Sequence, residues 1–356
     1  MTDLDTSAVE VRAPSAAPAV ADHPPRRHRV RQAWRTHHDG AVTLIALALA
    51  LACAVGILTW AIPVPLTHAG FPTIVAIRLE SVATIVLVGA SQGVATLVFQ
   101  TLVGNRILTP AVLGFDALYR LVQTALVFFL GSAALAETDG LVKVGLQSAL
   151  MVAFATILYG WLFTRLRLSL HVTLLVGIVL GMAFSSAATL MQRMLTPSEF
   201  DILAARLFGN ISTADGAYLP WAALVVAGAC AVLWRRRYVL DVVALGRQTA
   251  TSLGVAYRRE VLIVLVLVAV LVSVSVSLVG PMTFLGFIVA MLTYQLVREQ
   301  THARMLPMAA VLGTLALLAA YFVLRHVFYA GGLVTVVIEL VGGTLFLIYL
   351  LRKGLR

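Results

Sequence analysis

The sequence predicts an all-α membrane protein with about ten transmembrane helices. Sixty per cent of its 356 residues are apolar and only 12% are charged, whereas a soluble domain carries roughly a quarter charged residues. The mean hydropathy is +0.96. Apolar runs long enough to cross a bilayer, which takes about 20 residues, recur along the chain. Lipid is therefore the expected solvent for most of the surface.

The first forty residues differ from the rest of the chain. They are rich in Ala, Pro, Arg and His, show no periodic apolar pattern, and carry the basic residues Arg26, Arg27, Arg29, Arg31 and Arg35. Such a composition is typical of disorder. We expect residues 1–40 to form a disordered basic cytosolic tail, and residues 41–356 to form the transmembrane domain.

Apolar segments after this tail define the candidate spans. They cover residues 41–62, 74–103, 111–131, 146–164, 171–192, 216–234, 260–279, 282–297, 305–326 and 333–351. Residues 199–208 predict a short additional helix at the membrane face. Glycines within spans are expected to let helices approach closely; they are Gly89, Gly93, Gly177, Gly181, Gly286, Gly342 and Gly343. Gly280-Pro281 is expected to break the chain between two spans.

The distribution of basic residues predicts the orientation in the membrane. With a cytosolic N-terminus, 20 of the 26 Lys and Arg residues fall in cytosolic segments; the other six are Arg78, Arg120, Lys143, Arg193, Arg206 and Arg325. Cytosolic loops of membrane proteins carry such an excess. Both termini are therefore expected in the cytosol, and the net charge of +10 needs no nucleic-acid partner.

Sequence signatures of catalysis are absent. The chain has no G-x-x-x-x-G-K-[ST] loop, and its only lysines are Lys143 and Lys353, so P-loop binding of ATP is excluded. No H-E-x-x-H or G-x-S-x-G motif occurs, and Cys53 and Cys230 lie inside apolar runs. We expect no metal site and no cofactor on this chain. Transport energy would have to come from an ion gradient or from another subunit.

The segment 238–259 is too polar to span a membrane and too patterned for a linker. Asp241 is expected to cap a short helix that ends at Gly246. Residues Thr249–Leu253 are expected to form a second helix that ends at Gly254. Two short helices on the membrane surface would form a rigid knob against which a soluble partner can push. An ordinary ordered loop is the alternative interpretation.

Charged residues also lie within or at the ends of the predicted spans. Asp116 and Arg120 are four residues apart in one span and can pair. We expect Glu339 to reach the bundle interior near Arg120, because intramembrane charges usually face a partner or a cavity. A proton relay through these three residues, as in an ion-coupled secondary transporter, is the alternative; Glu80 is a further charge at a span end.

The runs ALGRQTATSLGVAYRR, GPMTFLGF and GGTLFLIYLLRK belong to three separated motifs. Together these motifs resemble the FecCD family of permeases, which belong to ABC importers for iron-siderophores, haem and vitamin B12. The first is the run ALGRQTATSLGVAYRR at 244–259 with GPMTFLGF at 280–287. The second combines Arg78-Leu79, VGA at 88–90, Gln100, Asn105, Pro110 and Leu113-Gly114, and the third is GGTLFLIYLLRK at 342–353. The resemblance covers roughly residues 70–352 and implies a type II ABC importer permease fold.

The sequence departs from the family pattern at several positions. The usual N-P-L-A is Asn105-Arg106-Ile107-Leu108, and the usual Pro-His is Ala290-Met291. GNRILTPAVLGFDALY and GPMTFLGF are more similar to the branch that serves catecholate-type ferric siderophores. The expected cargo is therefore a ferric chelate rather than vitamin B12.

The resemblance also implies partners and site residues. The partners are a cytosolic ABC ATPase dimer that binds ATP and Mg²⁺, a second permease (a paralogue rather than an identical copy), an extracytoplasmic substrate-binding protein, a ferric siderophore and membrane lipid of the bacterial plasma membrane. The residues expected to couple to the ATPase are Asp241, Leu245, Gly246, Arg247, Ser252, Leu253, Gly254 and Arg258.

Two further sets of residues follow from the resemblance. Arg78 and Arg325 match arginines that dock the binding protein, although the family's second arginine after Arg78 is Ser81 here. The cytosolic gate is expected at Asn105, Ile107, Ser169, Leu170 and His171. A self-sufficient secondary transporter and a membrane enzyme remain the competing classes, and uptake without ATP would distinguish the former.

Overall fold

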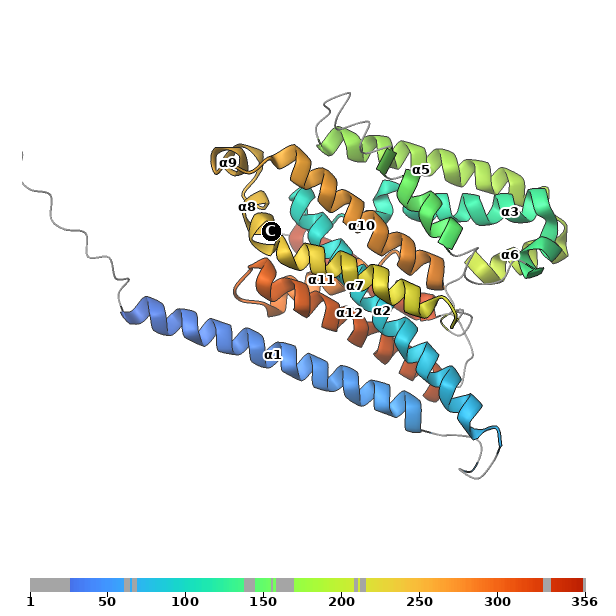
Figure 1. The fold of residues 1–356 in the computed structure, drawn as a ribbon, viewed down its shortest axis with the longest axis horizontal. Coiled ribbons are helices and arrows are strands. Elements are labelled where there is room, and N and C mark those ends of the chain that lie inside the picture. Colours follow the sequence, from blue (N-terminus) through green and yellow to red (C-terminus); the bar gives the residue numbers. More distant parts are fainter. Residues whose placement is uncertain are drawn as a thin grey trace, which may run out of the picture.

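The computed structural model describes residues 26–60, 65, 69–137, 145–154, 156–157, 170–207, 211, 216–328 and 334–354. Every regular element among these residues is a helix (Figure 1). The elements are α1 (Arg26–Thr59), α2 (Phe71–Val103), η1 (Pro110–Leu113), α3 (Phe115–Glu137), α5 (Leu170–Gln192), α6 (Pro197–Leu207), α7 (Leu219–Arg235), α8 (Arg237–Val243), α9 (Arg247–Ser252), α10 (Tyr257–Val279), α11 (Leu285–Leu296), α12 (His302–His326) and α13 (Val334–Gly354). The all-α expectation is confirmed.

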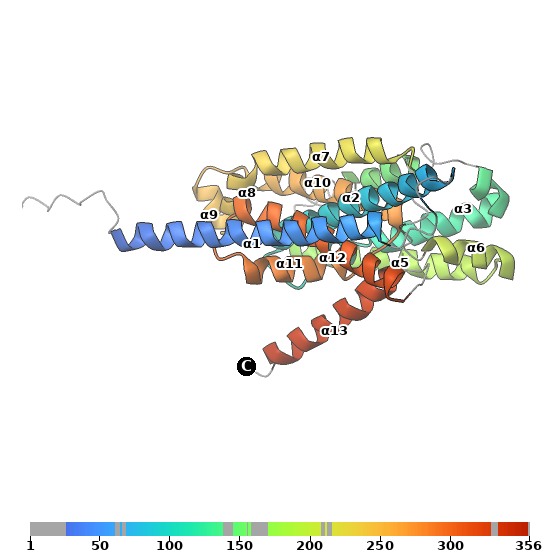
Figure 2. The ribbon, with the colours of Figure 1, turned by 90° about the horizontal axis from the view of Figure 1, so that it is seen from below.

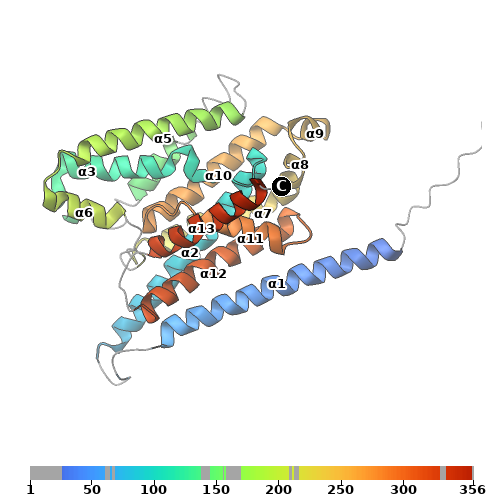
Figure 3. The ribbon, with the colours of Figure 1, turned by 180° about the vertical axis from the view of Figure 1, so that it is seen from behind.

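The long helices run between two ends of one bundle. Helices α8 and α9, the start of α1 and the C-terminus lie at one end, which we call the α9 end (Figures 1 and 3). Helix α6, the end of α1 and the start of α2 lie at the opposite end, the α6 end (Figure 1). Seen from below, α13 diverges from the other helices (Figure 2). Both ends of the described chain thus lie on the side of α8 and α9.

Helix α1 begins earlier than the sequence predicts. It starts at Arg26, directly after Pro24-Pro25, so residues 26–40 are helical and do not belong to a disordered tail. The reason is that this stretch contains no proline and carries five arginines, which favour helices. The expected disorder of residues 1–25 lies outside the described residues.

The number of spans can be compared with the described helices. Five helices are long and apolar enough to cross a membrane, and the bent pair α7–α8 makes a sixth. Shorter apolar helices add Gly145–Phe154, Leu285–Leu296 and Val334–Ile348. The expected span 146–164 lies partly outside the described residues, so the count of ten remains a prediction.

Glycines on α2 bring it into backbone contact with α12. A Cβ atom added to Gly89 would lie 2.5 Å from the carbonyl oxygen of Gly313, and one on Gly93 would collide with the carbonyl of Ala309. Side chains are therefore excluded from this seam, and close approach through small residues stabilises packing in lipid. The expected packing role is confirmed for these two glycines of α2.

Turn residues at the α6 end determine where two helices begin. Gly280 adopts φ +90° and ends α10, so the expected break at Gly280-Pro281 is confirmed and α11 is only 12 residues long. Before α6, the hydroxyl and backbone N–H of Thr196 both donate to Glu199, at 2.7 and 3.1 Å. The hydroxyl bond first and the N–H bond second lower the pKa of this carboxyl. The short helix expected at 199–208 is present as α6.

Candidate coupling surface and membrane cavity

Helices α8 and α9 form a compact projection at the α9 end. Helix α8 bends by 62° from α7. Gly246 and Gly254 adopt φ of +92° and +84°, a left-handed range that favours glycine, and they separate α8, α9 and α10. The two short helices and their glycine stops agree with the sequence-based expectation.

The projection presents apolar side chains to its surroundings. Leu245 is 60% exposed and Leu253 is 61% exposed, whereas Ala250 between them is buried. Arg247, Ser252 and Arg258 are exposed on the same segment. Two exposed leucines on a short rigid element are typical of a surface that a partner covers. We call Leu245, Arg247, Ser252, Leu253 and Arg258 the coupling surface.

Asp241 does not cap the helix for which the sequence suggests it. It lies inside α8, and its Oδ1 accepts hydrogen bonds from the backbone N of His302 at 2.8 Å and from Nδ1 of His302 at 2.6 Å. The expectation was wrong because the first N–H groups of α12 also lack intrahelical partners and come within reach of this carboxylate. On the other side, Nε2 of His302 lies 2.9 Å from Oγ1 of Thr101 in α2. We call Asp241, His302 and Thr101 the α8–α12–α2 chain.

Asp39 fixes the other end of the connection from α11 to α12. Its carboxylate accepts the backbone N–H groups of Arg298 and Glu299, at 3.0 and 2.9 Å, and the residue is only 1% exposed. The connection from α11 to α12 is therefore fixed by one carboxylate from α1 and one from α8. Sequence reasoning missed Asp39; an acid just before an apolar span was its only signal.

Arginines at the α9 end also have defined contacts. Arg236, between α7 and α8, forms an ion pair with Glu260 of α10. The guanidinium of Arg237 lies 4.7 Å from the ring centre of Trp234 and 4.5 Å from that of Tyr238. Arg106 lies over Tyr294 at 4.3 Å and donates to Gln300 at 2.9 Å. The arginine-rich segments thus gather at the end that carries the coupling surface.

The two arginines expected to dock a binding protein lie at the α6 end in different surroundings. Arg78 is 4% exposed, and its Nη1 donates to the carbonyl oxygens of Ile57 and Trp60 at 2.9 and 2.8 Å. It therefore satisfies the last carbonyls of α1 and is not available for docking in this conformation. Arg325 is exposed, and its Nη1 donates to the hydroxyl of Tyr321 at 2.9 Å.

Part of the expected gate lies beyond what the structure describes. Asn105 accepts the backbone N–H of Ile107 at 2.9 Å and forms a turn at the α9 end of α2. Ser169 lies outside the described residues, and Leu170 and His171 are described only as the first residues of α5. The gate remains a prediction.

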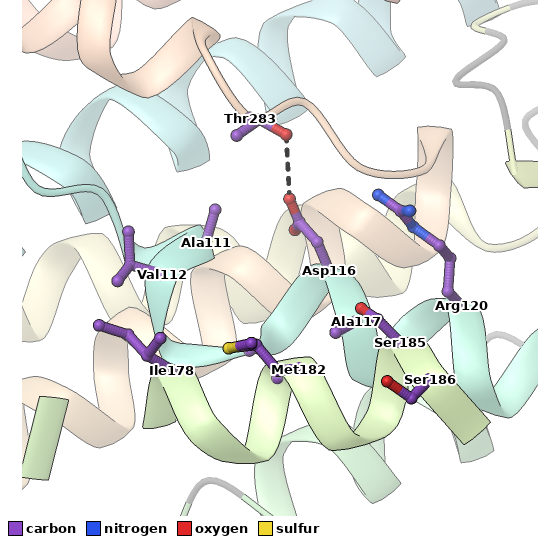
Figure 4. Close-up of a pocket in the computed structure, with 12 residues that line it drawn as sticks. Ala111, Val112, Asp116, Ala117, Arg120, Ile178, Met182, Ser185, Ser186 and Thr283 are labelled. Atoms are coloured by element: carbon purple, nitrogen blue, oxygen red, sulfur yellow. Dashed lines mark hydrogen bonds between the residues drawn. The ribbon is translucent and has the colours of Figure 1, made fainter. Parts of the chain in front are cut away.

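Two adjoining open hollows, which we call the two parts of the membrane cavity, are lined by the three charges expected within the membrane, Asp116, Arg120 and Glu339. The larger part, about 540 Å³, has Asp116 and Arg120 of α3 on one wall and Ser185 and Ser186 of α5 on another (Figure 4). The hydroxyl of Thr283 donates to Oδ2 of Asp116 at 3.3 Å. Arg120 also lines an adjoining part of about 270 Å³ together with Glu339 of α13.

The charges are brought together without forming the expected ion pair. Among the described residues, the ion pairs within 4 Å are His38–Asp39, Arg236–Glu260 and His302–Asp241, so Asp116 and Arg120 are not directly paired. Asp116 accepts a hydrogen bond from Thr283 instead, and Arg120 projects from the next turn of α3 (Figure 4). No group of three His, Cys, Asp or Glu residues in the described ranges is placed to hold a metal ion.

Comparison with known proteins establishes the family. The model of the FecCD transport family matches residues 41–353, which is most of the chain. This chain belongs to the FecCD transport family. The segments that carry the coupling surface and the cavity both fall within the matched region of this FecCD protein.

Relatives of this FecCD protein include permeases of importers. It is 41% identical over 312 residues to the petrobactin import system permease protein FatC of Bacillus anthracis, covering 88% of both chains. It is 36% identical to the petrobactin import system permease protein YclO of Bacillus subtilis, covering 78% of this chain and 88% of that one.

A solved structure shares the fold of this FecCD protein. It is described as an inward-facing conformation of a metal-chelate type ABC transporter, with a TM-score of 0.75 and 21% identity. The match covers 88% of this chain and 99% of the other. The expected permease architecture is confirmed at the level of the fold.

Proposed function

We propose that this FecCD protein is the membrane-spanning permease subunit of an ABC importer that carries a ferric siderophore of the catecholate type into the cytoplasm. Relatives with 41% and 36% identity are named petrobactin import system permeases, which supports a siderophore as cargo. ATP hydrolysis belongs to a partner subunit, since this chain has no phosphate-binding loop. The protein lies in the bacterial plasma membrane with the α9 end in the cytosol.

The observation that carries this function is the coupling surface. Leu245 and Leu253 project from two short helices held against α10 and α12 by Arg236–Glu260 and Asp241–His302. A cytosolic ATPase dimer can seat these leucines in an apolar cleft and pair acidic groups with Arg247 and Arg258. Exposed ion pairs contribute only ~0–1 kcal/mol each, so the fit of the leucines carries most of the contact.

The other partners meet different faces. A substrate-binding protein docks at the α6 end, where Arg325 is exposed. The second permease covers the exposed apolar residues of α5 and α13, among them Leu175, Met182, Leu340 and Leu347. A paralogue is the expected second permease, because both FatC and FatD of Bacillus anthracis, two petrobactin import system permease proteins, are similar to this chain, at 41% and 27% identity.

Reconstitution with separate partners tests this function. Proteoliposomes that contain this chain, its second permease, the ATPase and the binding protein should take up ferric siderophore only with ATP. The double variant Leu245→Asp, Leu253→Asp should abolish co-purification of the ATPase and lower uptake at least tenfold. Ser198→Asp adds a charge at an exposed site of the α6 end, far from the coupling surface, and should leave co-purification of the ATPase unchanged.

Two outcomes would contradict the proposal. Uptake by this chain without ATP or an ATPase would indicate an ion-coupled secondary transporter. Normal ATPase binding by the double variant, with the protein correctly inserted, would show that the coupling surface lies elsewhere.

A further inference from the structure

Arg120 is the cationic residue that lines both parts of the membrane cavity. It projects from α3 and lines the larger part (Figure 4), and it also lines the smaller part together with Glu339. Its side chain is exposed within the described chain, although it belongs to an apolar segment expected to cross the membrane. A guanidinium placed in this way is costly and usually serves a pathway or a partner.

The neighbouring acids leave Arg120 available. Asp116 accepts a hydrogen bond from Thr283, and neither Asp116 nor Glu339 forms an ion pair with Arg120 within 4 Å in the described part of the chain. The remaining lining of the larger part consists of small, hydroxyl-bearing and apolar side chains. Arg120 is therefore the strongest hydrogen-bond donor that this wall offers to a molecule inside the cavity.

We propose that Arg120 forms an anion-binding contact in the translocation pathway and recognises one free carboxylate group of the passing ferric chelate. The contact rests on the importer function proposed above. Guanidinium groups bind the paired oxygens of a carboxylate through two parallel N–H bonds. The volume of about 540 Å³ lies within the range of small-molecule sites.

The two acids limit what the contact accepts. Asp116, held by Thr283, and Glu339, in the smaller part, repel additional negative groups. One anionic group can bind Arg120, whereas a chelate with negative charge on all sides is held weakly. Weak binding suits transport, because a cargo must leave the site as well as enter it.

A pair of chelates tests this contact. Two ferric catecholate chelates of equal size, one with a free carboxylate and one with that carboxylate converted to a neutral amide, are taken up by the complete reconstituted importer. Wild type should transport the carboxylate form at least fivefold faster. Arg120→Gln should lower uptake of the carboxylate form about tenfold and remove the difference between the two, while Arg120→Lys keeps part of it.

Controls separate this contact from folding and from the importer function. Thr189→Ala, at an exposed site of α5 outside the lining of the cavity, should keep the preference, and the ATPase activity without cargo should stay within twofold of wild type in every variant. Equal uptake of the two chelates by wild type, or a preserved preference in Arg120→Gln, would overturn the contact. Absence of ATP-driven uptake of either chelate by wild type would instead overturn the importer function.

Discussion

Asp241 accepts two hydrogen bonds from one residue, His302, through the backbone N at 2.8 Å and through Nδ1 at 2.6 Å. The bonds join α8, directly before the coupling surface, to the first residue of α12. His302 is only 3% exposed, and its other ring nitrogen lies 2.9 Å from Thr101 of α2. A displacement of α8 is therefore passed to α12 and α2 through short polar contacts rather than through a flexible linker.

Removal of Asp241 should weaken both stability and coupling. Asp241→Ala leaves a buried imidazole and a helix N–H without their acceptor, and hydrogen bonds to charged groups are worth about 1.5–3 kcal/mol. The free energy of unfolding in detergent should fall by about that amount, and ATP-driven uptake should fall more than ATPase activity does. Exposed Gln248→Ala is the control for stability.

A double-mutant cycle identifies the contact responsible. Asp241→Ala, His302→Ala and the double variant should give an interaction energy of about 1–3 kcal/mol in unfolding. Additive effects would show that the two residues act independently, against the α8–α12–α2 chain.

Asp39 should protect the connection between α11 and α12 from proteolysis. Asp39→Leu leaves the backbone N–H groups of Arg298 and Glu299 without an acceptor, at a cost of about 1–3 kcal/mol per group where they stay buried. Trypsin cleavage after Arg298 should then become at least severalfold faster, as measured by mass spectrometry. Glu199→Ala removes a carboxylate at the α6 end and should not change this cleavage.

Alanine at Gly89 should destabilise the protein although alanine favours helices. Its Cβ would lie 2.5 Å from the Gly313 oxygen, and overpacking typically costs about 1–3 kcal/mol. Gly228→Ala in α7 is the matched control, because nothing lies within 4 Å of its added Cβ. We expect a lower Tm in detergent for the first variant and an unchanged or higher Tm for the second; equal Tm values would contradict the close seam.

The two arginines at the α6 end should respond differently to reversal of charge. Arg78→Glu removes the donor for the carbonyls of Ile57 and Trp60 and should lower Tm and the yield of folded protein. Arg325→Glu should leave Tm unchanged and weaken binding of the substrate-binding protein, measured by surface plasmon resonance at low salt. If Arg78→Glu weakened binding of the substrate-binding protein and left Tm unchanged, Arg78 would be a docking residue after all.

Features encoded by a few neighbouring residues could be predicted from the sequence. Gly246 and Gly254 end short helices, and Gly280-Pro281 breaks a span, because local backbone conformation decides each case. The exposure of Leu245 and Leu253 also follows from a polar segment between two apolar runs.

Contacts between distant segments could not be predicted in the same way. Asp241 binds a residue 61 positions away, and Asp39 binds a loop about 260 positions away. In both cases a backbone N–H is among the partners, and because every residue other than proline carries one, it leaves no mark in the sequence. Arg78 was assigned to docking for a related reason, since nothing in its surroundings along the chain indicates the carbonyls of α1.

The seam between Gly89 and Gly313 has a consequence for the way the protein moves. At Gly89 and Gly93 the backbones of α2 and α12 touch with no side chain between them that could repack, so we expect the two helices to move together as one rigid unit. Helix α2, with 33 residues, is about 50 Å long, which exceeds the roughly 30 Å of membrane hydrocarbon. A small rotation of the paired helices α2 and α12 at the α9 end therefore becomes a displacement at the α6 end. Opening and closing of the transport pathway then depend on the helices beside this pair.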